Sequence, residues 1–263
     1  MISVLKTACS GAVLRLTLND DASRNSLSEA MLDAVESQLK LASADRSISV
    51  IIIAGDGVAF SSGHNLKQLS AHRADADHGE AYFKVIFEQC ARVMMAIAQH
   101  RCVTIAEVQG LASAAGCQMV ASCDFAFANE HAKFCTPGVN IGLFCSTPMV
   151  ALSRAVSPRH AREMLLSGDV YDASHAERIG LVNKVLDSNS LTNYVSDFAA
   201  RIAAKSQGAI DVGKPAFDMQ AEMNLGVAYA HCSKLMVENF MNVSAREGVG
   251  AVLEKRKPVW PST

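Results

Sequence analysis

The chain is organised around the stretch Val108-Gln109-Gly110-Leu111-Ala112-Ser113-Ala114-Ala115-Gly116-Cys117-Gln118-Met119. This stretch connects a predicted buried strand, Ile105–Val108, to a helix that begins near Ala115. The residues between them are small, and small side chains let a ligand approach the backbone closely. A helix start also leaves unpaired N–H groups with a partial positive charge behind them. The stretch therefore predicts either a cradle for a negative oxygen or close packing of a helix on a sheet.

The composition is that of a soluble globular protein. The chain has 263 residues, 50% of them hydrophobic, which is enough for one large domain or one domain with an appendage. The formal net charge is -2 and no long basic run occurs, so nucleic acid is not an expected partner. No apolar run reaches the roughly 18 residues of a membrane span, so no membrane partner is expected either.

The cysteines indicate a reducing compartment. None of the eight forms a CxxC pair, so we expect reduced thiols and no metal site. The N-terminus carries no signal-peptide pattern. We therefore expect a cytoplasmic protein, or one of the mitochondrial matrix if a transit peptide has been removed.

Strand and helix patterns alternate in the first half of the chain and helices dominate the second. Two short strands are expected within residues 1–19, and the β-branched run Ile48–Ala54 is typical of a strand buried on both faces. Further strands are predicted at 104–108, 124–128 and 133–135, with helices after Ser28, over 83–99 and after Ala115. Helices are then predicted near 149–156, 158–167, 173–180, 190–204, 207–224, 225–241 and 244–255. This order predicts an α/β core, largely parallel, followed by a helical region.

A second small-residue loop has the same form as the first. Phe60-Ser61-Ser62-Gly63-His64-Asn65-Leu66 also leads from a strand to a helix. One backbone N–H from each loop, aimed at one point, could hold a thioester carbonyl oxygen as it gains negative charge. Losing one such donor typically costs about 2.7–4 kcal/mol of transition-state stabilisation. The two loops together predict an oxyanion hole.

The ordered motifs resemble the crotonase, or enoyl-CoA hydratase/isomerase, superfamily over nearly the whole chain. The resemblance implies an α/β fold with a spiral of ββα units in residues 1–195, which hold the acyl-CoA site. It implies a helical region, residues 196–263, that closes the CoA site and forms trimers or hexamers. Its ligand would be a coenzyme A thioester, with no other cofactor. The matching segments are Asn25–Leu27, Phe60–Leu66, Val108–Gly110, Gly116–Gln118, Cys123–Asp124, Phe134–Pro137, Gly168–Asp169 with Ala173 and Ala176, Gly180–Val182, Arg246–Gly248 and Glu254–Arg256.

The resemblance also implies particular site residues. The main-chain N–H groups of His64 and Ala115 would be the oxyanion donors. Many relatives have Gly at the position of Ala115, and Ala still supplies the N–H. The basic tail at Lys255 fits either a contact to the CoA phosphates or a solvated helix end. The residues expected to contact the CoA ligand are Asn25, Leu27, Ser62, His64, Asn65, Leu66, Lys67, Ala115 and Lys255.

The chain departs from the family pattern at both acid–base positions. Hydratases of this family are similar to one another in carrying two glutamates, where this chain has Gln118 and Gly138. General acid–base help is worth roughly 10²–10⁴-fold per group, so we expect weak or absent hydration of a 2-enoyl-CoA. Gln118 could still position a water or a carbonyl by hydrogen bonding.

Other side chains are candidates for the missing chemistry. The His64 imidazole is the first, because histidine titrates near neutral pH. Glu107, among apolar neighbours, is either a buried carboxylate with a raised pKa or one half of a salt bridge to a neighbouring helix or subunit. A Cys145–His64 nucleophile pair is conceivable but lacks an orienting third group. Asn140, Cys145 and Ser146 are expected to line the acyl pocket.

Two kinds of function remain open. One is an enzyme of the hydratase/isomerase type, a lyase or isomerase of fatty acid metabolism, that reacts through a thioester enolate. The other is a catalytically silent acyl-CoA-binding protein or subunit, which would keep the oxyanion hole without the acids. RNA binding, known for some family members, is a remote third option, since no basic helix stands out.

Overall fold

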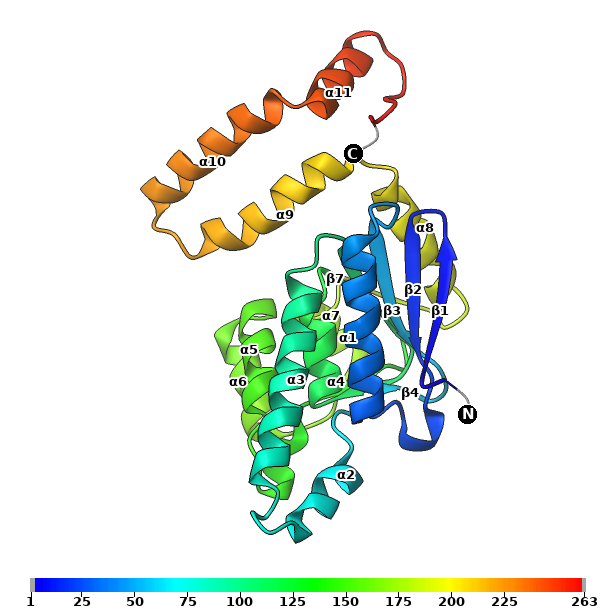
Figure 1. The fold of residues 1–263 in the computed structure, drawn as a ribbon, viewed down its shortest axis with the longest axis vertical. Helices are drawn as coiled ribbons and strands as arrows, with labels where there is room; N and C mark the ends of the chain where they lie inside the picture. Colours follow the sequence, from blue (N-terminus) through cyan, green and yellow to red (C-terminus); the bar gives the residue numbers. More distant parts are fainter. Residues whose placement is uncertain (1–2, 262–263) are drawn as a thin grey trace. The chain divides into compact units, whose positions relative to one another are not determined.

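The chain forms short strands and long helices in alternation (Figure 1). The structure is a computed structural model that describes residues 3–261, so the first two residues of the predicted N-terminal strands lie outside it. The strands are β1 (Leu5–Ser10), β2 (Val13–Leu18), β3 (Val50–Gly55), β4 (Ala59–Ser61), β5 (Val103–Val108), β6 (Leu111–Ser113), β7 (Phe125–Asn129), β8 (Lys133–Cys135), β9 (Tyr171–Asp172) and β10 (Lys184–Leu186). The α-helices are α1 (Glu29–Ala44), α2 (Leu66–Ala71), α3 (Glu80–Ala98), α4 (Ala115–Ser122), α5 (Ser146–Ala155), α6 (Pro158–Ser167), α7 (Ala173–Arg178), α8 (Leu191–Ala203), α9 (Gln207–Ala221), α10 (Leu225–Phe240) and α11 (Val243–Leu253). The 3₁₀ helices are η1 (Asp21–Ser23), η2 (His72–Ala74) and η3 (Pro137–Ile141).

The chain divides into two compact units, Met1–Ala199 and Ala200–Thr263. The first unit contains two sheets, and successive strands of the chain join them in turn. The larger sheet has the order β1-β2-β3-β5-β7-β10, and the smaller has the order β4-β6-β8-β9. Successive strands β3 and β4, β5 and β6, and β7 and β8 therefore go to different sheets before helical structure follows. Strands are parallel except for β1 against β2 and β9 against β8. This arrangement confirms the predicted spiral of ββα units.

The larger sheet is covered on both faces. Val50–Ile53 of β3 are all buried, as the β-branched run predicts. In β7 the side chains alternate, so that Ala126 and Ala128 join the main core while the Phe127 ring contacts Phe198 of α8, with ring centroids 5.0 Å apart. Helices α1 and α3 pack against each other on the core side (Figure 1).

Only β8 of the smaller sheet was predicted as a strand. Strands β4 and β6 lie at the start of or inside the two small-residue segments, which the sequence indicated only as loops. Strands of two or three residues are too short to show a period. Gly116 at the start of α4 allows the helix to approach this sheet, since a Cβ there would lie 2.4 Å from the Ser61 carbonyl oxygen.

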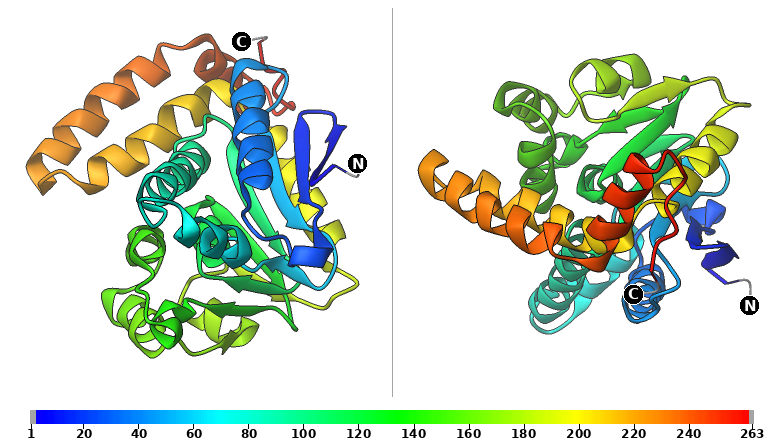
Figure 2. Two further views of the ribbon diagram at one scale, coloured as in Figure 1. Left: turned by 60° about the horizontal axis from the view of Figure 1, so that its bottom comes forward. Right: turned by 90° about the horizontal axis from the view of Figure 1, so that it is seen from above.

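The second unit consists of helices, as predicted for the C-terminal region. Helices α9 and α10 run side by side in both views (Figures 1 and 2). The Trp260 indole Nε1–H donates to the Ala204 carbonyl at 2.9 Å and ties the end of the described chain to the start of this unit. Among residues 3–261, no helix is both long and apolar enough to cross a bilayer.

Glu107 forms a partly buried salt bridge, as predicted, but its partner lies on a neighbouring strand and not on a helix or another subunit. Its carboxylate on β5 accepts from Arg15 Nη2 of β2 at 2.8 Å and from Thr192 Oγ1 of α8 at 2.9 Å. Glu107 is 6% exposed. The contact therefore connects β2 and β5 across β3 and attaches the start of α8.

We expect Glu107→Gln to lower the free energy of unfolding by about 2 kcal/mol, because Arg15 then loses a charged partner in a partly buried place. Urea unfolding at one fixed protein concentration measures the change. Lys6→Gln is the matched control, since the Lys6–Asp56 pair at 2.6 Å is exposed to solvent and should contribute much less to stability. Equal losses in the two variants would contradict the assignment.

Candidate functional site

The two small-residue loops of the sequence lie against each other. Gly63 has φ +83°, and a Cβ there would lie 2.9 Å from the Ser113 carbonyl oxygen and 3.2 Å from the Ala115 nitrogen. Both the backbone conformation and the close contact require glycine. The loop after β4 and the loop after β6 therefore form one continuous site.

The backbone N–H groups of His64 and Ala115 lie at this junction. Ala115 is the first residue of α4, where no preceding turn of helix offers an acceptor. In the described part of the chain, neither N–H donates to another backbone group. Leu27 joins the same place, because its N–H donates to the Gly63 carbonyl at 2.8 Å and it forms an isolated parallel bridge with His64.

Ala114 carries the backbone strain of the site. Its φ is 50° and its ψ is -116°, a region that suits glycine, whereas Ala115 is already helical. Ala115 therefore tolerates its side chain, and the unfavourable conformation belongs to the residue before it. Sequence reasoning missed this, although Ala114 stands in the middle of the small-residue run.

The two positions where the resemblance implies glutamates in relatives differ in their surroundings. Gln118 on α4 is 4% exposed, and its Oε1 is buried with no hydrogen-bond partner among residues 3–261. A side chain at Gly138 would crowd its neighbours, because a Cβ would lie 2.9 Å from Cys145 Sγ and 3.1 Å from the Leu143 carbonyl oxygen. Cys145 therefore lies directly against the Gly138 backbone.

The His64 imidazole lies in an apolar environment. Its ring makes an edge contact with Phe87 of α3 at 5.1 Å between centroids, a neighbour that sequence reasoning missed. Both ring nitrogens are buried and have no hydrogen-bond partner within the described chain. Burial lowers the pKa of His64 to about 4, against a smaller opposing contribution from the Leu27 backbone, so the ring is neutral at pH 7.

The structure does not support a Cys145–His64 nucleophile pair. Neither ring nitrogen of His64 bonds the thiol. Burial also raises the pKa of the Cys145 thiol, which disfavours the reactive thiolate. Asn140 and Ser146 bond nearby carbonyls instead, those of Gly168 and Phe144.

The other residues that were predicted to contact the CoA ligand lie in different surroundings. Asn25 is fully buried, and its Nδ2 donates to the Asp56 and Ala59 carbonyls, both at 2.8 Å. Ser62 Oγ donates to the Ser23 carbonyl at 3.1 Å. Asn65 caps α2 by accepting from the N–H groups of Lys67 and Gln68, and both Leu66 and Lys67 are exposed at the start of that helix. Lys255 belongs to the second unit.

We expect Ala114→Gly to raise the free energy of unfolding by about 1 kcal/mol, because it removes a side chain from a left-handed conformation. Thermal or urea unfolding measures the change. Ala115→Gly is the matched control, and the same substitution one residue later should destabilise, since Ala115 is helical. A loss of stability in both variants would show that Ala114 is not strained.

The low pKa of His64 predicts a pH-dependent stability. Between pH 6.5 and about 4 the unfolded chain binds a proton that the folded chain excludes, so stability falls as the pH is lowered through this window. When unfolding is measured from pH 7.5 to 4.5, the free energy of unfolding should decrease less steeply for His64→Leu than for the unmodified protein. His131→Gln, at a side chain that is 78% exposed, should leave the slope unchanged. An unchanged slope in His64→Leu would mean that the ring is not held neutral.

The chain is similar in fold and sequence to known proteins. The family described as enoyl-CoA hydratase/isomerase matches residues 8–263. Enoyl-CoA hydratase domain-containing protein 3, mitochondrial, of Homo sapiens is 43% identical over 248 residues, which cover 94% of this chain and 80% of the relative. The 2,3-dehydroadipyl-CoA hydratase of Escherichia coli is 31% identical over 247 residues, 94% of either chain. The crystal structure of enoyl-CoA hydratase from Mycobacterium smegmatis superposes with a TM-score of 0.92 at 41% identity, covering 98% of both chains. The chain therefore belongs to the enoyl-CoA hydratase/isomerase family.

Proposed function

We propose that the protein binds an acyl-CoA thioester and polarises its carbonyl with the backbone N–H groups of His64 and Ala115. The observation that carries this proposal is the contact of Gly63 with Ser113 and Ala115, which brings two N–H groups without backbone acceptors to one place. The name of the Escherichia coli relative, a hydratase of a CoA ester, supports the same ligand class.

The chemistry follows from where charge develops. When a proton leaves the acyl Cα, the electron pair moves toward the thioester oxygen, and an enolate forms. Two fixed N–H donors stabilise that oxygen more strongly than the neutral carbonyl, and each is worth about 2.7–4 kcal/mol. The segment from His64 to Lys67, which is exposed at Leu66 and Lys67, would run beside the CoA moiety, with the Lys67 ammonium available to a phosphate.

Ordinary hydration should be weak. Gln118 has no ionisable group, and at Gly138 the contact with Cys145 leaves no space for a carboxylate. The neutral His64 ring could accept a proton, and Gln118 could hold a water or a carbonyl through its unpartnered Oε1.

The second candidate function is silent binding of acyl-CoA. It is favoured by the filled position at Gly138, because a protein that only binds the thioester needs the donors and not the acids. In either case we propose assembly into a trimer or hexamer through the second unit, whose helices expose Phe217, Tyr229, Met236 and Phe240 within that unit. The name of the human relative favours the mitochondrial matrix over the cytoplasm.

Binding and proton exchange together separate the two functions. We expect butyryl-CoA to bind in calorimetry, and its Cα protons to exchange in D₂O in the presence of the enzyme, followed by NMR. Binding without exchange, and without turnover of enoyl, 3-hydroxyacyl or malonyl esters, would favour the silent binder. No binding at all would overturn both.

The substitution Gln118→Glu tests the role of this position directly. The two side chains are nearly isosteric, so a carboxylate fits where the amide now stands. We expect crotonyl-CoA hydration to rise at least about tenfold over the unmodified protein, while Gln118→Ala should not raise it. Hydration by the unmodified protein at the rate of ordinary family members, abolished in Gln118→Ala, would contradict the proposal.

A further inference from the structure

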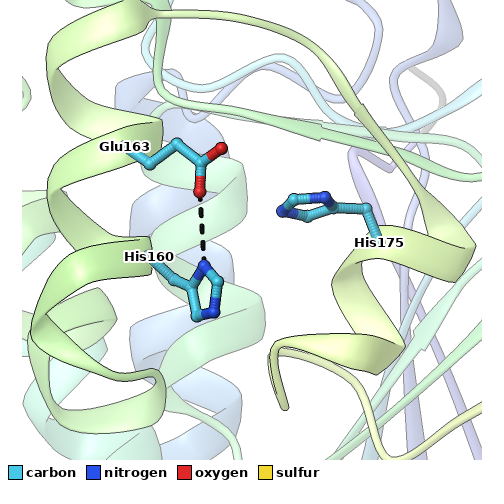
Figure 3. Close-up of side chains that lie close together, drawn as sticks. All are labelled: His160, Glu163 and His175. Carbon is cyan, nitrogen blue, oxygen red and sulfur yellow. Dashed lines mark hydrogen bonds and ion pairs between the residues drawn. The ribbon is translucent and has the colours of Figure 1, made fainter.

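A cluster of three side chains that can bind a metal ion lies on α6 and α7 of the first unit. His160, Glu163 and His175 each offer one nitrogen or oxygen atom, and these atoms all lie within 4.8 Å of one another. Figure 3 shows the His175 ring pointing from α7 toward the other two side chains on α6. None of these residues belongs to the loops around His64 and Ala115.

Local structure brings the three together. His160 and Glu163 are three residues apart on α6 and share one helix face, with Nδ1 of the ring 3.2 Å from Oε2 of the carboxylate. His175 is positioned by its backbone, whose N–H donates to the capping carboxylate of Asp172 at 2.8 Å, and by the Tyr171 ring, 4.4 Å away between centroids. The cluster therefore lies at the surface, between α6 and α7.

One atom of the cluster has no partner. Nε2 of His175 is buried and makes no hydrogen bond within residues 3–261. Two imidazoles and a carboxylate are ligands that Zn²⁺ accepts, at about 2.0–2.2 Å, with a fourth position left for water. We propose that His160, Glu163 and His175 form a Zn²⁺ site. The expectation of no metal rested on cysteine spacing, which carries no information about this cluster.

Arg178 competes with the metal. Its Nη2 donates to His175 Nδ1 at 2.7 Å, so the ring proton resides on Nε2, the atom that faces the cluster. Metal binding through Nε2 moves that proton to Nδ1 and requires the exposed Arg178 side chain to turn away. Removing the guanidinium should therefore strengthen metal binding.

The site would also support the loop that carries Gly138. The end of α6 accepts hydrogen bonds from that region, from Thr136 Oγ1 to the Met164 carbonyl at 2.9 Å and from Asn140 Nδ2 to the Gly168 carbonyl at 3.2 Å. A metal that ties α6 to α7 would hold this face of η3 in place.

The test is titration of the tag-free, metal-stripped protein with ZnCl₂ in a calorimeter. We expect one ion per chain. The Kd for zinc should rise at least tenfold in His160→Ala, His175→Ala and the isosteric Glu163→Gln. It should fall several-fold in Arg178→Gln. Saturating zinc should raise the thermal midpoint of the unmodified protein by about 5 °C and leave His160→Ala unchanged.

His131→Ala is the matched control, because His131 lies 3.7 Å from Glu130 without a second imidazole. It should bind zinc like the unmodified protein. Zinc binding that is absent, or equal in the unmodified protein and the three ligand variants, would overturn the site. If an alanine variant fails to fold, Glu163→Gln and Arg178→Gln decide, since opposite shifts in Kd are expected from them.

Discussion

The close approach of α4 to the two short strands β4 and β6 is the constraint on which the structure depends. A Cβ on Gly116 would lie 2.4 Å from the Ser61 carbonyl oxygen, and one on Gly63 would lie 2.9 Å from that of Ser113. Only glycine tolerates both contacts. Because these glycines lie where the chain passes from sheet to helix, the same packing that closes the ββα turn also aligns two helix-entry loops.

The stability of the core offsets several unfavourable features at this junction. Ala114 adopts a left-handed conformation, which typically costs 1–3 kcal/mol. Both nitrogens of His64 and Oε1 of Gln118 are buried without partners in the described residues. Buried polar groups in folded proteins usually have partners, so several exceptions in one place indicate groups that a ligand or water completes. The buried strands β3 and β5 supply the apolar packing that tolerates them.

Gln118 and Gly138, the two positions where the resemblance implies glutamates in relatives, are physically distinct. At Gln118 an amide stands where a carboxylate would fit with little change in shape. At Gly138 a Cβ would lie 2.9 Å from Cys145 Sγ, so a larger side chain would require movement of Cys145 or of the loop before α5. The two positions therefore differ in how readily a carboxylate could be introduced.

The long elements, the alternating α/β order and the family could be predicted from the sequence, because residue periodicity and ordered motifs are local properties of the chain. The sequence also indicated the two loops that meet at Gly63 and Ala115. The three-dimensional structure was needed to show that these loops contain strands of a second sheet, that the strain lies on Ala114, and that Glu107 pairs with Arg15. It alone brought His175 to His160 and Glu163, and placed Cys145 against Gly138. These features depend on contacts between segments that are separate in sequence, and such contacts leave no period or motif to read.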